Sequence, residues 1–330
     1  MPESKETEIV SVTIPGRLHL GFLDLNGSLG RRFGSLGLSI SGLRTKVEFR
    51  RAEALRVTGP ECDRVMKYME RMMRRLGVNG GCHVEVTDTV PAHVGLGSGT
   101  QLALAVAAGI RRLHRRPLDI PGDAHHLGRG GRSGIGIGLF DRGGFIVDGG
   151  VANDGLPAPT IARLRWPDRW RIILLLDPLR RGIHGSAEID AFRRLPPFSD
   201  DDAGRLCRLV MMRMLPAIVE EDVLNFGSAI TEIQSCVGRY FAPAQGGSAF
   251  TSPDVAAVLA ALAAEGGVGI GQSSWGPTGF AFAASEEEGD RLAAVARRHP
   301  CGLELDIRVC AGFNHAAEIS VTSSDGVGSS

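Results

Sequence analysis

A glycine-rich segment of this 330-residue chain combines residue types that bind phosphate groups. It reads Val-Pro-Ala-His-Val-Gly-Leu-Gly-Ser-Gly-Thr over 90–100, after a strand-like run at 83–88 and before a helix-like run at 100–108. Glycines let a backbone approach an anion closely, and the amino end of the following helix directs unpaired N–H groups and partial positive charge at the loop. A plain tight turn between a strand and a helix is the alternative. The predicted phosphate ligands are the loop residues Gly95, Gly97, Ser98, Gly99 and Thr100.

The loop lacks two common phosphate-binding signatures. No Gly-Lys-Ser/Thr follows it, as in a P-loop, and it does not have the G-x-G-x-x-G spacing of a dinucleotide site. Its core, Pro-x-x-x-Gly-Leu-Gly-Ser, instead resembles the second motif of the GHMP superfamily, which includes galactokinase, homoserine kinase and mevalonate kinase.

Four further segments are similar to one branch of that superfamily. The opening segment at 14–40 contains Arg-Leu-His, Asp-Leu-Asn-Gly and Gly-Ser-Leu-Gly-Leu, and glycine-rich blocks follow at 128–140, 182–188 and 271–279. They look like the β-ribofuranosylaminobenzene 5′-phosphate synthases, also called β-ribofuranosylphenol 5′-phosphate synthases, of methanopterin biosynthesis. The resemblance spans Ile9 to Ser320, and several motifs in the right order are more specific than one loop.

This resemblance implies a fold and an activity. We expect an α+β, GHMP-kinase-like two-domain fold, with a ribosomal-protein-S5-domain-2-like N-terminal half at 1–165, a ferredoxin-like C-terminal half at 166–322 and a flexible tail at 323–330. Members of the branch are pentosyltransferases that join phosphoribosyl pyrophosphate to 4-aminobenzoate or 4-hydroxybenzoate. They release pyrophosphate and carbon dioxide and leave a C-riboside 5′-phosphate. The resemblance also implies Mg2+ as the cofactor and a homodimer.

The rival enzyme is an ATP-dependent GHMP small-molecule kinase, and a nucleotide-binding relative without catalysis is the alternative that is not an enzyme. Many GHMP kinases have Ser-Gly-x-Asp where this chain has Ser-Gly-Ile-Gly at 133–136, and Gly136 cannot act as the base. Gly99 replaces a kinase serine that helps to hold magnesium. Lysines that could steady a transferring phosphoryl group are scarce, because the chain has only Lys5, Lys46 and Lys67.

Charged residues in the resembling segments can be assigned to the anionic groups of such a substrate. Arg129 and Arg132, together with Ser133, suit bidentate contacts to phosphate, although both arginines could equally be solvated surface charges. Asp24 and Asp148 are the predicted magnesium ligands, because magnesium needs only one or two protein carboxylates beside substrate oxygens. Either aspartate could instead be a turn residue.

Histidines and carboxylates in the same segments are the predicted catalytic groups. His19 and His184 could orient the benzoate or shuttle a proton, and Glu188 lies one helical turn beyond His184. Glu188 could instead cap a helix start together with Ser186. The predicted catalytic set is His19, Asp24, His184 and Glu188.

Polar residues at the edges of the motifs are the predicted contacts to the organic part of the substrates. Trp275 could stack on an aromatic ring or anchor the packing of its loop. The predicted set is Arg17, Asn26, Gln101, Gln272, Ser273, Ser274, Trp275 and Thr278.

Composition and charge limit other functions. A formal net charge of zero argues against a nucleic-acid binder, which would show a basic face. The six cysteines have no close metal-ligand spacing, so a reduced cytoplasmic thiol set is expected. No stretch approaches the roughly 20 apolar residues of a membrane span. We therefore expect a soluble, cytoplasmic protein with small-molecule partners and no membrane or nucleic-acid partner.

Hydrophobic periodicity places these motifs on secondary-structure elements. Strand-like alternation covers 9–14, 45–50, 82–88 and 144–148, and helical spacing covers 62–76 and 100–114. After a linker at 156–167, a strand at 171–177 opens the second half, whose predicted helices lie at 202–219, 221–237, 253–265 and 286–299. Strands at 280–284, 303–309 and 316–321 complete a split β-α-β pattern, which is typical of a ferredoxin-like half.

Overall fold

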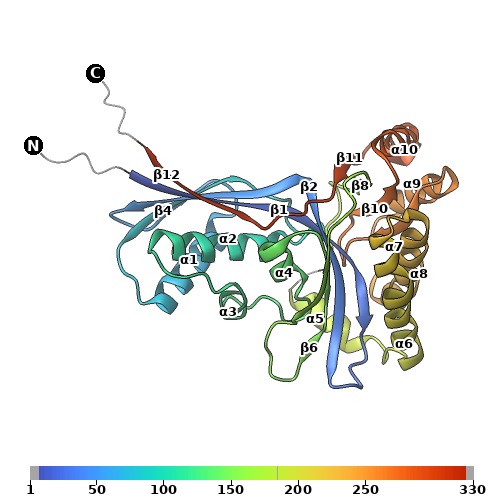
Figure 1. The fold of residues 1–330 in the computed structure, drawn as a ribbon, viewed down its shortest axis with the longest axis horizontal. Coiled ribbons are helices and arrows are strands. Elements are labelled where there is room, and N and C mark those ends of the chain that lie inside the picture. Colours follow the sequence, from blue (N-terminus) through green and yellow to red (C-terminus); the bar gives the residue numbers. More distant parts are fainter. Residues whose placement is uncertain (1–6, 184, 325–330) are drawn as a thin grey trace, which may run out of the picture.

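The computed structural model of the chain describes residues 7–183 and 185–324. Its central element is a long antiparallel hairpin of β1 (Thr7–Asp24) and β2 (Arg31–Ala52), which bends downward through the middle of the molecule in Figure 1. In the described residues this hairpin belongs to an eight-stranded sheet ordered β12-β1-β2-β4-β3, with β5 and β6 also pairing with β2, and β7 with β5. The other strands of this sheet are β3 (Arg56–Thr58), β4 (Gly81–Asp88), β5 (Phe145–Asp148), β6 (Val151–Ala152), β7 (Thr160–Leu164) and β12 (Glu318–Ser324).

Helices of the N-terminal half lie below the long strands in Figure 1. They are α1 (Cys62–Leu76), α2 (Ser98–Leu113), α3 (Ile120–His126) and α4 (Ile135–Arg142). Helix α2 is buried along most of its length because its apolar run from Leu102 to Ala108 contacts the sheet on one side and α1 on the other. This packing fixes the amino end of α2, where the glycine-rich loop enters.

The second half is built on a four-stranded antiparallel sheet ordered β11-β8-β10-β9. Alternate residues of β8 pack on opposite faces: Ile173 and Leu175 against α9 and α10, and Ile172 and Leu174 against the core beneath α8. Because both faces are buried, β8 is a continuous apolar run. The strands are β8 (Arg171–Leu176), β9 (Val268–Gln272), β10 (Gly279–Ala283) and β11 (Asp306–Ala311). The helical elements are α5 (Ser186–Arg194), α6 (Asp200–Leu209), the π-helical η1 (Val210–Met214), α7 (Leu215–Val219), α8 (Val223–Phe241), η2 (Ala242–Ala244), α9 (Pro253–Ala264), α10 (Glu286–Arg298) and η3 (Pro300–Gly302).

Most predicted elements are confirmed, and one strand lies in the other sheet. Helix α1 has the predicted bounds, α9 and α10 end one residue earlier than predicted, and the bounds of α2 and α8 lie within four residues of theirs. The strand predicted at 316–321 was assigned to the ferredoxin-like half, but β12 pairs with β1 in the N-terminal sheet, with Val10 opposite Val321. The chain thus returns to cover the edge of β1, which would otherwise present unpaired backbone groups. Strand β12 also reaches Ser324, so it includes the first residues of the predicted tail.

A buried ion pair ties α3 to α2 and so positions the segment that follows. Both Arg111 of α2 and Asp123 of α3 are buried, and Arg111 donates from Nη2 to Asp123 Oδ1 at 2.8 Å. The backbone N–H of Arg129 then donates to the Ala124 carbonyl at 2.7 Å. The glycine-rich block that begins at 128 is therefore held against the same helix that carries the phosphate loop.

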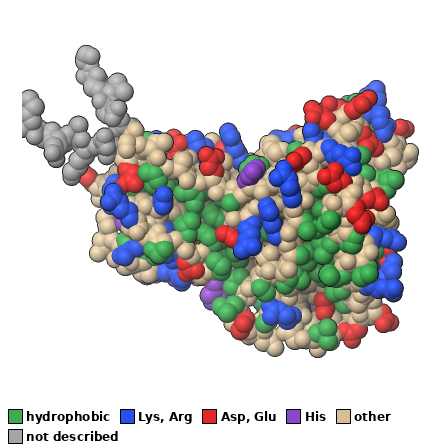
Figure 2. Space-filling model, viewed as in Figure 1, with side chains coloured by type: hydrophobic (Ala, Val, Ile, Leu, Met, Phe, Trp, Pro, Cys, Tyr) green, Lys and Arg blue, Asp and Glu red, His purple; other side chains and the backbone are tan. Residues whose placement is uncertain are grey.

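The surface agrees with the balanced composition. Figure 2 shows basic and acidic side chains interspersed over the face in view. Among the described residues, no helix is long and apolar enough to cross a membrane.

Candidate active site

A cleft of about 820 Å³ lies where the central hairpin, the glycine-rich loop, the loop before α4, helix α5 and the loop after β9 meet. Thirteen of the residues predicted from the sequence line it. They are Arg17, His19, Gly95, Gly97, Ser98, Gly99, Thr100, Arg129, Arg132, Ser133, Glu188, Ser274 and Trp275. The structure thus brings residues from five separate sequence motifs to one cavity.

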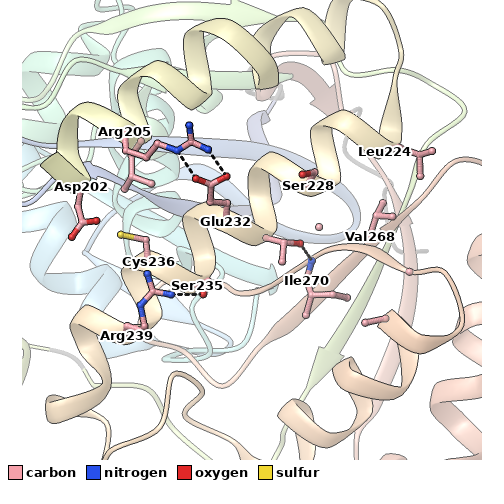
Figure 3. Close-up of a pocket in the computed structure, with 16 residues that line it drawn as sticks. Asp202, Arg205, Leu224, Ser228, Glu232, Ser235, Cys236, Arg239, Val268 and Ile270 are labelled. Carbon is pink, nitrogen blue, oxygen red and sulfur yellow. Dashed lines mark hydrogen bonds and ion pairs between the residues drawn. The ribbon is translucent and has the colours of Figure 1, made fainter.

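A second cavity, of about 610 Å³, is shown in Figure 3 and lies between α6, α8 and β9. Its Arg205 and Glu232 side chains neutralise each other through a two-bond ion pair, Nε to Oε1 at 2.6 Å and Nη2 to Oε2 at 3.0 Å. None of the residues predicted from the motifs lines this second cavity. We therefore place the candidate active site in the first cleft.

The amino end of α2 provides an anion-binding position in the cleft. Gly97 precedes the helix with φ of 77°, and no acidic side chain lies in the first turn of α2. Helix α4 differs, because the backbone N–H of Gly134 at its start donates to Asp148 Oδ2 at 2.8 Å. The α4 end is thus matched by a carboxylate of the chain itself, whereas the first turn of α2 has no such carboxylate.

Arg17 of β1 places its guanidinium directly against the loop. A Cβ atom on Gly97 would lie 2.4 Å from Arg17 Nε, so only glycine leaves room for the guanidinium there. In the described residues, Arg17 Nε and Nη1 are buried and have no hydrogen-bond partner. Burial lowers the pKa of Arg17 to about 10, and the nearby charge of Glu188 acts in the opposite direction. Arg17 is therefore a half-buried cation with two unused donors beside a helix amino end.

Two further arginines approach from the block at 128–133. Arg129 Nη1 would lie 3.5 Å from a Cβ on Gly99, and the Arg129 guanidinium donates to the Tyr68 hydroxyl and stacks over its ring at 5.5 Å. Arg132 Nη2 forms an ion pair with Glu188 Oε2 at 2.8 Å. The predicted partner of Glu188, His184, lies outside the described residues. Within them, the pair joins a carboxylate of α5 to an arginine from the other half of the chain.

His19 follows Arg17 on the same face of β1 and is 3% exposed. The backbone N–H of Gly21 donates to His19 Nδ1 at 3.3 Å, which assigns the ring proton to Nε2. Among the described residues Nε2 is buried without a partner. Burial, with a smaller contribution from the charge of Arg17, lowers the pKa of His19 well below its ordinary value. His19 is therefore a neutral imidazole that offers one N–H donor.

Neither predicted magnesium ligand faces the cleft. Asp148 is fully buried and accepts hydrogen bonds from the backbone of Ser35 at 3.1 Å, Gly134 at 2.8 Å and Gly150 at 2.9 Å, and from the Ser35 hydroxyl at 2.5 Å. Asp24 Oδ1 accepts from the backbone of Asn26 at 2.8 Å and of Gly27 at 2.9 Å, as a turn aspartate does. These assignments are corrected: Asp148 positions the 133–134 loop, and Asp24 shapes the end of the hairpin.

Four more predicted contacts also support the structure instead of lining the cleft. Asn26 donates to the Phe198 carbonyl at 2.8 Å, and the Gln101 amide donates to the Pro15 carbonyl. Ser273 is fully buried and joins the two glycine-rich loops, because its hydroxyl donates to the Gly95 carbonyl at 2.8 Å. Thr278 is fully buried as well.

The second glycine-rich loop brings its aromatic residue into a cluster. Trp275 is 2% exposed and lies against Phe241 at 4.2 Å and Phe192 at 5.4 Å between ring centroids. It therefore anchors the packing of its loop while one edge lines the cleft. Gln272 lines a smaller cavity behind the cleft.

The sequence analysis missed an aromatic wall of the cleft. Phe22, Phe33, Phe192 and Trp275 all line the cleft. Simple alternation along β1 would put Gly21 on the face of Arg17 and His19, but a register shift between His19 and Gly21 turns Phe22 to that side. The bulge itself leaves only a weak signal, the glycine at position 21.

The fold and two family models define the class of protein. The models described as GHMP kinases N terminal domain and GHMP kinases C terminal match residues 63–143 and 214–300. Homoserine kinase from Cytophaga hutchinsonii superposes with a TM-score of 0.68 at 16% identity, covering 97% of this chain and 99% of that one. Mevalonate diphosphate decarboxylase from Staphylococcus aureus gives 0.65 at 15% identity, covering 95% and 98%. The fold is that of the GHMP kinases.

Two relatives narrow the family. A β-ribofuranosylphenol 5′-phosphate synthase of Methanothermobacter thermautotrophicus is 33% identical, over 86% of this chain and 92% of the relative. One of Archaeoglobus fulgidus is 37% identical, over 67% of this chain and 74% of the relative. This chain belongs to the family of β-ribofuranosylphenol 5′-phosphate synthases, within the GHMP kinase superfamily.

Gly97→Ala should impair anion binding. Alanine disfavours φ of 77°, and its Cβ would displace the Arg17 guanidinium. We expect the dissociation constant of inorganic pyrophosphate, measured by calorimetry, to rise about tenfold or more. Gly204→Ala in α6 is the control, because nothing lies within 4 Å of its Cβ. Equal pyrophosphate affinity in Gly97→Ala and the unaltered protein would contradict the site.

The lowered pKa of His19 should appear in the pH dependence of stability. Just below about pH 6.5 the unfolded chain binds a proton that the folded chain does not. The free energy of unfolding should therefore fall as the pH drops below that value, by up to about 1.4 kcal/mol per pH unit from this group. Denaturant titrations at several pH values should show that the free energy of unfolding falls less steeply with decreasing pH in His19→Gln than in the unaltered protein. His83→Gln, at a half-buried histidine of β4, is the control. The same pH dependence in His19→Gln and in the unaltered protein would refute the assignment.

Proposed function

We propose that this protein is a decarboxylating ribosyltransferase that joins phosphoribosyl pyrophosphate to a para-substituted benzoate. Family membership supports the proposal, and so does a cleft that is lined by both arginines and aromatic rings. The observation that carries it is the half-buried Arg17 against the glycine-rich loop, with Nε and Nη1 buried and without a hydrogen-bond partner in the described residues. Those two nitrogens suit an anionic ligand, and the group lies where a kinase of this fold would need a base.

The arginines of the cleft match a donor that carries both a pyrophosphate and a 5-phosphate. Within the described residues the cleft is lined by six arginines and one carboxylate, Glu188. The arginines are Arg17, Arg32, Arg64, Arg129, Arg132 and Arg193. Low-dielectric surroundings strengthen the attraction of such cations for phosphate, and guanidinium groups bind phosphate in bidentate fashion.

Kinase chemistry is disfavoured by the surroundings of Gly136. This residue occupies the position of the kinase aspartate, and a Cβ there would lie 2.9 Å from Thr100 Cγ2 and 3.7 Å from Arg17 Nε. The local charge is therefore positive where a kinase places a carboxylate. Among the described residues no lysine lines the cleft, and Lys46 pairs with Glu48 at 3.0 Å.

In the proposed reaction the bond between C1′ and the pyrophosphate oxygen breaks, and its electron pair leaves with pyrophosphate. The ring carbon that bears the carboxylate bonds to C1′. The bond from that ring carbon to the carboxylate carbon then breaks, its electron pair restores the aromatic ring, and carbon dioxide leaves. No phosphoryl group is transferred. Arg17 and the amino end of α2 would bind pyrophosphate more strongly as its negative charge develops, which accelerates the first step.

Two details of the substrates follow from other observations. The two relatives are named as synthases of a ribofuranosylphenol phosphate, which supports 4-hydroxybenzoate over 4-aminobenzoate as the acceptor. For magnesium, the residues present do not fit the predicted site, because Asp24 and Asp148 bind backbone N–H groups away from the cleft and Glu188 pairs with Arg132. No step of the proposed reaction is therefore assigned to magnesium.

The test is release of labelled carbon dioxide. Purified protein in magnesium-containing buffer is incubated with carboxyl-labelled 4-hydroxybenzoate and either phosphoribosyl pyrophosphate or ATP. We expect labelled carbon dioxide only with phosphoribosyl pyrophosphate, together with equimolar pyrophosphate. Formation of ADP from ATP with an alcohol substrate would point to a kinase instead, and binding of either nucleotide or donor without turnover would point to a regulator.

A further inference from the structure

A small cavity of about 20 Å³ adjoins the inner end of the cleft. His19, Phe22 and Ser274 line both spaces. Its volume suits one water molecule or one hydroxyl group. The ring of Phe22 lies 4.5 Å from that of His19, so the approach to the cavity has an aromatic side.

Glutamine side chains fix the polar lining of this cavity. The Gln272 amide uses both N–H groups, donating to Gln245 Oε1 at 3.0 Å and to the Ser274 carbonyl at 3.1 Å, so its orientation is set. The Gln234 amide donates once, to the Leu20 carbonyl at 2.8 Å, and its Oε1 accepts from the backbone of Gln272 at 2.8 Å. These contacts use only one of the two N–H groups of the Gln234 amide. The lining of the cavity therefore has a hydrogen-bond donor that these contacts do not use.

His19 adds a donor of fixed direction. Its Nδ1 is occupied by the Gly21 N–H, which leaves Nε2–H as a buried donor without a partner in the described residues. Leaving such a donor unpaired costs free energy that a ligand acceptor would recover. An oxygen with lone pairs can accept a hydrogen bond from Nε2–H, whereas another N–H group cannot.

The orientation of the acceptor follows from the proposed function, on which this inference rests. The carboxylate-bearing ring carbon must face C1′, and C1′ carries the pyrophosphate, which the proposed function places at Arg17 and the amino end of α2. The para substituent therefore points the other way, along the aromatic wall. We propose that the small cavity is the subsite for this substituent, and that His19 Nε2–H donates to a para oxygen. His19 is then the residue that selects 4-hydroxybenzoate over 4-aminobenzoate, since an aniline nitrogen shares its lone pair with the ring and presents N–H donors.

Acceptor specificity tests the proposal. We expect kcat/KM for carbon dioxide release to be at least about tenfold higher with 4-hydroxybenzoate than with 4-aminobenzoate. His19→Leu should lose most of that ratio through a lower value for the hydroxy acid. His19→Gln should keep use of the hydroxy acid but bring the ratio toward one, because a carboxamide can turn to present either a donor or an acceptor. His83→Gln, outside both cavities, should keep the ratio of the unaltered protein. Equal losses with both acids in the His19 variants, or no preference in the unaltered protein, would overturn the role.

A binding measurement on the unaltered protein separates this inference from the proposed function and from misfolding of the variants. In histidine labelled with nitrogen-15, the Nε2 signal of His19 should shift when phenol is added and not when aniline is added. Absence of carbon dioxide release with either acid would remove the proposed reaction. An unchanged His19 signal in phenol would remove the subsite.

Discussion

The guanidinium of Arg17 is the constraint on which the site depends, because its Nε and Nη1 are buried without a hydrogen-bond partner in the described residues. Buried donors that lack partners cost free energy, and an anion can supply the missing contacts. The chain places this cation against Gly97, at the amino end of a helix that has no acidic residue in its first turn. Both features favour the same ligand, so the free protein holds a site already organised for a phosphate-bearing molecule.

The central hairpin carries both a cationic and an aromatic part of the cleft lining. Arg17 and His19 lie on the same face of β1 toward the cleft, and the bulge that follows turns Phe22 to the same side. Strand β12 covers the edge of β1, and the loop beside Arg17 is fixed by the burial of α2. A short stretch of one strand thus supplies a cation, a neutral imidazole and an aromatic ring to the same cleft.

The motifs predicted residues that the fold brings to one cleft, because glycines before a helix start allow other segments to approach closely. They predicted roles less well for residues whose chemistry serves structure equally. Asp148 has the right charge for a metal ligand, but the start of α4 and the backbone of Ser35 use its oxygens. Ser273 joins two loops through a hydroxyl that a sequence pattern reads as a substrate contact. Long-range pairings of this kind depend on tertiary packing, as does the return of β12 to β1 across the whole chain.

Gly136 and the glycine-rich loop explain how a protein with a kinase fold can catalyse ribosyl transfer. Gly136 removes the carboxylate expected of a kinase and leaves room beside Arg17, while the phosphate loop stays in place. In the proposed reaction the cleft still binds phosphate groups, but the bond that breaks is at a carbon of the sugar and not at phosphorus.

Pyrophosphate binding to Arg17→Gln tests the central claim most directly. Calorimetry should give a dissociation constant at least about tenfold higher than that of the unaltered protein, the loss expected for a charged hydrogen bond. Arg44→Gln is the control, because Arg44 pairs with Asp88 at 3.2 Å and does not line the cleft. A dissociation constant for Arg17→Gln equal to that of the unaltered protein would contradict the account.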